Sequence, residues 1–187
     1  MFLIIGLGNP GALYRETKHN MGREAVGALQ AHAGLPAFLF EKKWNAQRTE
    51  GKIGKEKVGL VLPDTTMNKS GHAAAAAVRF FKIKPACVFM AHDDADLTLG
   101  STKLSFGKHS AGHKGVESVI RALKTRDFWR LRIGIGGKRD IPAEKIVLKK
   151  FSPQEQKIAK RMIKKTVAAL MKAISESPER AMNEYNQ

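Results

Sequence analysis

The sequence is poor in cysteine, in acidic residues and in long apolar runs, and each shortage excludes a class of protein. Its single cysteine, Cys87, excludes an internal disulfide framework and any zinc site built from several thiolates. No apolar run approaches the roughly 18 to 20 residues of a membrane-spanning helix. The first residues carry no basic segment, and the turn at 8–11 interrupts their apolar run too early for a signal peptide. We therefore expect a soluble cytoplasmic protein that makes no contact with a membrane.

Acidic residues are far outnumbered by basic ones. Seventeen Asp and Glu oppose 33 Lys and Arg, which gives a formal net charge of +16 and favours a polyanionic partner such as nucleic acid. The 187 residues amount to about one domain, and an apolar content of 43% is enough for a core. We expect one folded domain over residues 1–187 rather than a disordered basic tail.

Apolar runs and amphipathic segments interleave along the chain in an order typical of α/β proteins. Strands are expected near residues 2–5, 44–53, 57–62, 86–91, 101–106 and 129–135, and helices near 20–33, 67–81 and 113–123. Cys87 lies in one of these runs and is expected to be a buried strand residue. The hairpin-like pair near 44–62 favours a mixed sheet. The predicted fold class is α/β: a single domain with a twisted mixed β-sheet flanked by α-helices.

A basic amphipathic helix is expected at about 153–175. Ser152 supplies an N-cap hydroxyl, Pro153 suits the first helical position, and Glu155 follows three residues after the cap. Apolar side chains form one stripe of this helix and lysine and arginine side chains the opposite face. Such a face is either solvated or in contact with a nucleic-acid backbone, and the net charge favours the second interpretation.

Polar side chains follow three of the expected strands. Asn9 comes after the first strand and His19 lies further along the same loop, while Asn68 and the carboxylates of 93–96 follow two others. Sites in α/β proteins lie at the carboxyl edge of the sheet, so these residues are expected to converge. A histidine paired with an aspartate suits general-base work, and amide groups can stabilise an oxyanion. Since the chain has no Gly-x-Ser-x-Gly elbow, attack by water is favoured over a covalent nucleophile.

Short motifs also suggest a dinucleotide or a metal. Residues 6–11 have the spacing G-x-G-x-x-G, but the next helical pattern begins near Asn20, too late to place its N-terminus on a pyrophosphate. The carboxylates of 92–96 suit a divalent cation, although few other carboxylates accompany them. His109 and His113 have i, i+4 spacing, but the glycines around them favour a loop. We therefore expect neither an organic cofactor nor a metal.

Five blocks of sequence stand in order over nearly the whole chain. They are Gly-Leu-Gly-Asn-Pro-Gly-x-x-Tyr-x-x-Thr-Lys-His-Asn at 6–20, Thr-Met-Asn-Lys-Ser-Gly at 66–71, His-Asp-Asp-Ala-Asp-Leu at 92–97, Gly-His-Lys-Gly at 112–115 and Arg-Leu-Arg-Ile-Gly-Ile-Gly at 130–136. Together they resemble bacterial-type peptidyl-tRNA hydrolase. The resemblance implies a monomer that hydrolyses the ester between a peptide and the 3′ ribose of tRNA, recycling tRNA from prematurely released peptidyl-tRNA, without metal or cofactor.

The resemblance also implies roles for individual residues. His19 matches the family's catalytic base and Asp93 the carboxylate that orients it. The amides of Asn9 and Asn68 match those that position the substrate. Tyr14 and Met67 match side chains that line the family's site around the peptide and the terminal ribose.

Two positions depart from the family pattern. Lys114 stands where the family usually has asparagine; a lysine donates hydrogen bonds to an oxyanion or to tRNA phosphates but cannot accept one from water. Ser105 replaces a basic residue that helps grip the tRNA 5′ phosphate, and Lys103 and Arg132 are expected to compensate. These departures make a catalytically silent RNA-binding relative the alternative, although RNA binding alone has no use for the hydrolytic residues.

Overall fold

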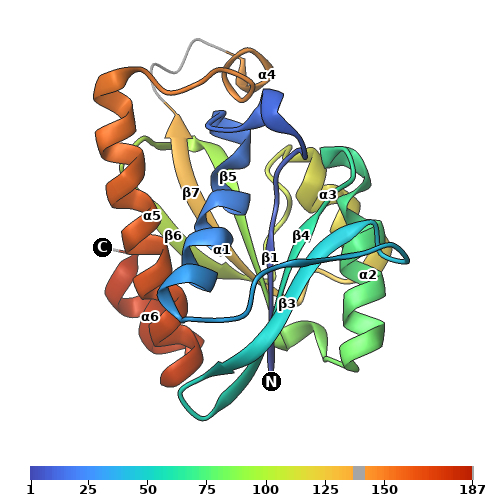
Figure 1. The fold of residues 1–187 in the computed structure, drawn as a ribbon. Helices are drawn as coiled ribbons and strands as arrows, with labels where there is room; N and C mark the ends of the chain where they lie inside the picture. Colours follow the sequence, from blue (N-terminus) through green and yellow to red (C-terminus); the bar gives the residue numbers. More distant parts are fainter. Residues whose placement is uncertain (137–141, 187) are drawn as a thin grey trace.

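The chain folds into a seven-stranded mixed sheet with helices on both faces (Figure 1). The computed structural model describes residues 1–136 and 142–186. The strand order is β2-β3-β4-β1-β5-β7-β6. The strands are β1 (Phe2–Gly6), β2 (Leu39–Glu41), β3 (Ala46–Ile53), β4 (Glu56–Pro63), β5 (Val88–Thr98), β6 (Thr102–Phe106) and β7 (Trp129–Gly136). The expected α/β fold is confirmed, while 137–141 and 187 of the expected domain lie outside the described residues.

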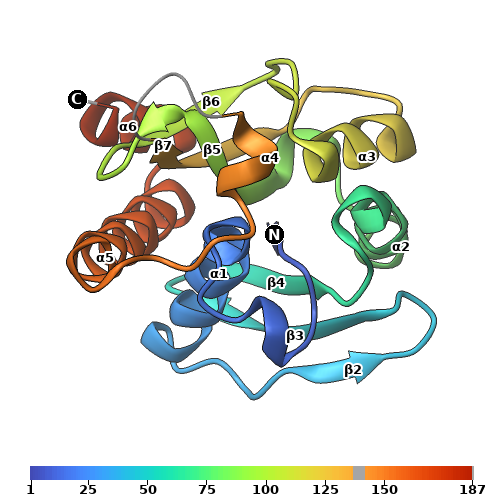
Figure 2. The ribbon, with the colours of Figure 1, turned by 90° about the horizontal axis from the view of Figure 1, so that it is seen from above.

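Two pairs of helices sandwich the sheet (Figure 2). One face is covered by α1 (Met21–His32) and α5 (Pro153–Ser175), the other by α2 (Ser70–Phe81) and α3 (Lys114–Leu123). Two short helices complete the chain: α4 (Ala143–Ile146), above the carboxyl ends of the strands, and α6 (Pro178–Tyr185), against β6.

The central strand is β1, which pairs in parallel with β4 on one side and β5 on the other. Its residues are apolar because successive side chains enter opposite cores. Leu3 and Ile5 pack in the cluster beneath α2 and α3, whereas Ile4 packs in the cluster beneath α1 and α5. The parallel arrangement brings the ends of β1, β4 and β5 to one edge of the sheet.

Glycines let α1 lie directly on this sheet. A Cβ atom on Gly22 would collide with the carbonyl oxygen of Ala91, and one on Gly6 would lie 2.7 Å from the carbonyl oxygen of Gly22. The glycines after β1 therefore serve close packing of helix and sheet. The first α-helix begins at Met21, so no α-helix N-terminus lies within the glycine-rich segment 6–11, as expected.

Several sequence predictions were wrong in detail. Cys87 is half-buried in a 3-10 helix, Pro85–Cys87, and not in a strand. The following strand does not end at residue 91: β5 continues to Thr98 because its pairing with β7 resumes after an irregularity beyond Asp94. The strands and helices absent from the prediction are β2, α4 and α6.

The C-terminal helices are held at both ends. Ser152 and Glu155 form the expected capping box at the start of α5, which has the predicted bounds. Beyond α6, the side chain of Asn186 accepts a hydrogen bond from Leu104 N (2.7 Å) and donates one to Leu104 O (2.9 Å). These two bonds occupy backbone groups on the outer edge of β6.

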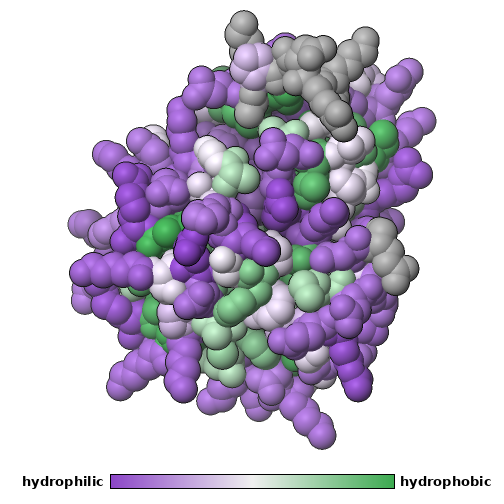
Figure 3. Space-filling view, turned by 180° about the vertical axis from the view of Figure 1, so that it is seen from behind, coloured by the Kyte–Doolittle hydropathy of each residue, from purple (hydrophilic) through white to green (hydrophobic). Residues whose placement is uncertain are grey.

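Hydrophilic side chains dominate the face of the molecule that is hidden in Figure 1 and shown in Figure 3. In residues 1–136 and 142–186, no helix is both long and apolar enough to cross a membrane.

Candidate active site

A cleft of about 570 Å³ opens at the carboxyl edge of the sheet, between α3, α4 and the loop after β1. It is lined by every residue predicted to act in catalysis or to bind the ester and peptide: Asn9, Tyr14, His19, Met67, Asn68, Asp93 and Lys114. Lys103 and Arg132, predicted to contact tRNA, lie outside its lining. The parallel strands β1, β4 and β5 explain why segments far apart in sequence meet here.

His19 and Asp93 form a hydrogen-bonded pair in this cleft. The Nδ1 atom of His19 lies 2.9 Å from each carboxylate oxygen of Asp93. An ionised carboxylate only accepts hydrogen bonds, so Nδ1 carries the proton and donates. The Nε2 atom of His19 is therefore the unprotonated nitrogen of the neutral ring, and it is the one left for chemistry in the cleft.

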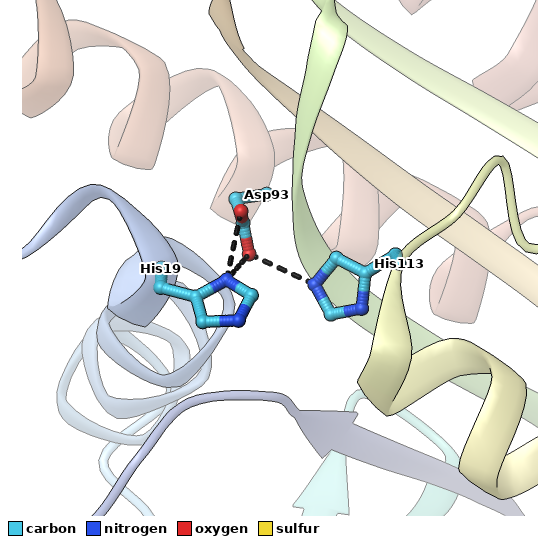
Figure 4. A group of neighbouring side chains, drawn as sticks. All are labelled: His19, Asp93 and His113. Carbon is cyan, nitrogen blue, oxygen red and sulfur yellow. Dashed lines mark hydrogen bonds and ion pairs between the residues drawn. The ribbon is translucent and has the colours of Figure 1, made fainter. Parts of the chain in front are cut away.

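His113 approaches the same carboxylate from the other side (Figure 4). Its Nε2 atom lies 2.9 Å from Oδ1 of Asp93. Its Nδ1 atom accepts hydrogen bonds from the backbone N–H groups of Gly115 (3.1 Å) and Val116 (3.2 Å), so His113 is the N-cap of α3. Because Nδ1 accepts, the proton must sit on Nε2, and His113 is a donor that locks the Asp93 carboxylate.

Asp93 stays ionised in this setting. Burial alone would raise the pKa of its carboxyl, but the interactions with His113 and His19 outweigh burial and hold the pKa well below its usual range. His92 is fully buried beside His113, and its Nδ1 atom donates to the carbonyl oxygen of Asp93 (2.7 Å). Burial, together with His113, lowers the pKa of His92 well below its usual value, so His92 packs as a neutral ring.

His19, Asp93 and His113 are also the one group of potential metal ligands found in the described residues. A metal bound to Nε2 of His113 would take the lone pair of Nε2, so Nε2 could carry no proton. Nδ1 carries no proton either, because its lone pair accepts the N–H groups of Gly115 and Val116. Both nitrogens would then lack a proton, which requires an imidazolate. The capping geometry therefore favours a hydrogen-bonded cluster over a metal site.

The carboxylates of 92–96 do not converge on one cation. Asp93 faces the histidines, whereas Asp94 accepts from Nε of Arg132 (2.6 Å) and from the backbone of Asp96. His109 lies 2.6 Å from Nη1 of Arg126, so it is not paired with His113. Neither motif gathers a set of ligands around one point.

Both site asparagines have their amide oxygens occupied. Oδ1 of Asn9 accepts from the backbone N–H of Met67 (2.9 Å), and two bonds with Asn20 hold the backbone of Asn9 in place. Oδ1 of Asn68 accepts from the hydroxyl of Thr66 (2.9 Å). The side-chain NH₂ groups of Asn9 and Asn68 make no hydrogen bond elsewhere in the described residues, so both are available as donors in the cleft.

The other cleft residues differ in exposure. Met67 is 6% exposed and packs under the site, while Tyr14 is half-buried in the loop after β1. Nζ of Lys114 lies 3.0 Å from Oε1 of Glu144 on α4, and both side chains are largely exposed. Lys114 and Glu144 therefore form an ion pair at the rim of the cleft.

Two of the three residues predicted to contact tRNA, Lys103 and Arg132, lie on the β6–β7 edge of the sheet; the third, Lys114, is the one at the rim of the cleft. Lys103 pairs directly with Arg132 across the two strands, so their side chains share a face. Arg132 is bound to the buried carboxylate of Asp94, which leaves Lys103 as the exposed cation of the two. Ser105 pairs with Arg130, which faces the same side of the sheet as Lys103 and Arg132 but is only 1% exposed.

The sequence did not predict the contacts that His113, His92 and Glu144 make at the site. One signal was present for His113: a histidine at the first position of a predicted helix is an unusual N-cap, where Ser, Thr, Asp and Asn are preferred. No local pattern indicated that Glu144 would reach Lys114 from another helix.

The sequence matches one family of known proteins over nearly its whole length. The family model for peptidyl-tRNA hydrolase matches residues 3–187. A peptidyl-tRNA hydrolase of Aquifex aeolicus is 41% identical over 190 residues, covering 99% of this chain and 96% of its own. One from Trichodesmium erythraeum is 38% identical over 192 residues, covering 98% and 87%.

A solved structure has the same fold. The crystal structure of peptidyl-tRNA hydrolase from Acinetobacter baumannii superposes with a TM-score of 0.92 at 32% identity, over 100% of this chain and 94% of that one. Sequence and structure thus match over the full length and not at the motifs alone. The chain belongs to the peptidyl-tRNA hydrolase family.

Proposed function

We propose that this protein hydrolyses the ester that joins a peptide to the 3′ ribose of tRNA. The observation that carries the proposal is the His19–Asp93 pair, whose 2.9 Å contacts leave Nε2 of His19 as the base in a cleft that also holds two free amide donors. Family membership supports the same reaction and does not favour an RNA-binding protein without activity.

In the proposed mechanism, Asp93 holds the Nδ1 proton of His19 and Nε2 takes a proton from water. The resulting hydroxide attacks the ester carbonyl, and the NH₂ groups of Asn9 and Asn68 donate to the oxyanion. The tetrahedral intermediate then expels the ribose 3′ oxygen, which takes the proton from Nε2. General-base help of this kind is worth about 10²- to 10⁴-fold in rate.

The peptide would lie in the cleft over Met67 and beside Tyr14, where apolar side chains from 147–148 also line the wall. Lys114 is assigned to the rim: it reaches peptide or tRNA only by leaving Glu144, so it is not a direct replacement for an amide at the ester.

The tRNA is proposed to lie against the positive surface. Lys103 and Arg132 would contact its phosphates near the acceptor end. Exposed basic residues of α5 lie over the other face of the sheet and would offer a second basic contact; they include Lys157, Arg161 and Lys164. The net charge of +16 supports a polyanionic substrate.

We further propose that the protein acts as a monomer in the cytoplasm, without metal or organic cofactor. One chain supplies all the residues of the mechanism, and the capping geometry of His113 supports metal independence.

The test is release of labelled N-acetyl-amino acid from N-acetyl-aminoacyl-tRNA, with and without EDTA. Release that persists in EDTA and collapses in His19→Ala is the expected result. Tight tRNA binding without release by the wild type would overturn the proposal and identify a silent RNA-binding relative.

A further inference from the structure

The catalytic histidine sits on a short turn whose support comes from a distant part of the chain. His19 lies within the 3-10 helix Lys18–Asn20, between a long loop and α1. The backbone N–H of His19 donates to Val147 O (2.7 Å) and that of Lys18 to Lys149 O (3.0 Å). An isolated β-bridge joins Thr17 and Lys150. The segment just before α5 therefore holds the backbone of the base.

The side chain of Lys18 joins these two segments a second time. It is 11% exposed, and its Nζ atom lies 2.7 Å from Oε1 of Glu155 and 5.2 Å from the ring centre of Phe151. A lysine is rarely buried unless it is paired, and here a carboxylate and the face of an aromatic ring surround the ammonium group. Lys18 therefore points away from the cleft and into the structure.

Glu155 is itself fixed. Its Oε2 atom accepts from the backbone N–H of Ser152 (2.8 Å) in the capping box, so one carboxylate joins the first turn of α5 to Lys18. Burial alone would raise the pKa of Glu155, but the hydrogen bonds from Lys18 and Ser152 outweigh it and lower the pKa. The partner of Lys18 is thus a rigid, ionised group on a long helix.

We propose that Lys18 is a positioning residue for hydrolysis: its ion pair with Glu155 holds the turn that carries His19, and so keeps the imidazole in register with Asp93. The inference rests on the proposed function of His19 as the base. His19 touches the reacting atoms, whereas Lys18 acts only through it. Displacing a catalytic group by about 1 Å costs as much as ~10²-fold in rate, so this anchor acts on kcat.

The experiment compares initial rates of N-acetyl-aminoacyl-tRNA hydrolysis by wild type, Lys18→Met and Lys18→Arg at several substrate concentrations. Lys18→Met keeps the aliphatic stem and is expected to lower kcat by about 10-fold or more with KM unchanged, and Lys18→Arg is expected to restore most of the rate. Lys55→Met removes the same charge at the exposed β3–β4 turn and should behave as wild type.

A double-mutant cycle separates positioning from general damage. In a His19→Ala background, Lys18→Met should cost nothing further, because no base remains to be positioned. Glu155→Gln removes the negative partner of Lys18 and should cause the same loss in kcat. If thermal unfolding shows that Lys18→Met does not fold, the kcat of Glu155→Gln tests the role of the ion pair instead.

The outcomes distinguish this inference from the proposed function. If wild type releases no amino acid, the proposed function has failed. If wild type is active and folded Lys18→Met or Glu155→Gln keeps its kcat, or if the cost of Lys18→Met is undiminished in His19→Ala, the positioning role of Lys18 is overturned.

Discussion

Replacing Asp93 by asparagine changes one atom of the site and tests the assigned tautomer of His19. Oδ1 of Asp93 accepts from both histidines, and an asparagine oxygen at that position can still accept from His113. The Oδ2 position, 2.9 Å from Nδ1 of His19, would become an NH₂ group facing an N–H group. Two donors cannot share that contact, so His19 is expected to move its proton to Nε2 and accept at Nδ1.

The cost follows from the lost base. With a proton on Nε2, His19 has no lone pair for water, and kcat should fall by about 10²- to 10⁴-fold, equivalent to about 3 to 5 kcal/mol in the activation barrier. KM should change little, because Asp93 is 1% exposed and its oxygens face the histidines.

The assay is initial-rate hydrolysis of N-acetyl-aminoacyl-tRNA by Asp93→Asn at several substrate concentrations. Asp96→Asn is the matched control, since Asp96 is an exposed residue of the same strand and should keep the wild-type rate. If folded Asp93→Asn kept kcat within about tenfold of wild type, the tautomer argument would be refuted.

Four further results are expected. Asp93 also affects stability in acid, because its pKa is lower in the folded chain than in the unfolded chain. As the pH falls below the ordinary aspartate pKa of about 4, the unfolded chain binds a proton that the folded chain does not. The free energy of unfolding, measured in urea, should therefore decrease over this pH range more steeply for wild type than for Asp93→Asn. Lys114→Asn should leave kcat within about fivefold and lower the melting temperature by no more than about 4 °C, since an exposed ion pair contributes about 1 kcal/mol at most; a large gain in kcat would instead place Lys114 at the ester. Lys103→Ala combined with Arg132→Ala should raise KM and reduce the slope of log affinity against log salt by about 2, and an unchanged slope would remove both residues from the tRNA contact. Gly22→Ala should destabilise the fold by at least about 1 to 3 kcal/mol in urea unfolding, because its Cβ would collide with the carbonyl oxygen of Ala91.

The elements predicted best from sequence are those specified by their own residues. The bounds of α5 follow from a cap, a proline and a stripe of apolar side chains, and β1 from an apolar run with glycine after it. The helix α6 carries a similar start, because Ser177 caps Pro178–Tyr185, so this missed helix was recognisable. By contrast, β2 has two exposed residues, one half-buried residue and no local pattern; its pairing with β3 alone defines it.

The site shows the same division. Its polar residues were found because parallel strands bring their carboxyl ends together, which is a rule of topology. The extension of β5 through Asp93 was hidden, since a strand of His, Asp and Asp has a low intrinsic preference for sheet and depends on β7 for its pairing. The partners of Lys18 and Lys114 depend on α5 and α4 docking nearby, which no spacing along the chain encodes.

The central position of β1 also sets the order in which the chain can fold. The residues of β1 leave the ribosome before their neighbours, yet Phe2 to Ile5 pair with 58–61 and Leu3 to Gly6 pair with 88–91. Until both partners are made, an apolar segment has no sheet to enter and is open to aggregation or to a chaperone. The loops that must close before it is buried are long, so folding should be slow for a domain of this size. The strand that supports the active site is thus synthesised before both of its partners, and its pairing is complete only when β5 has followed.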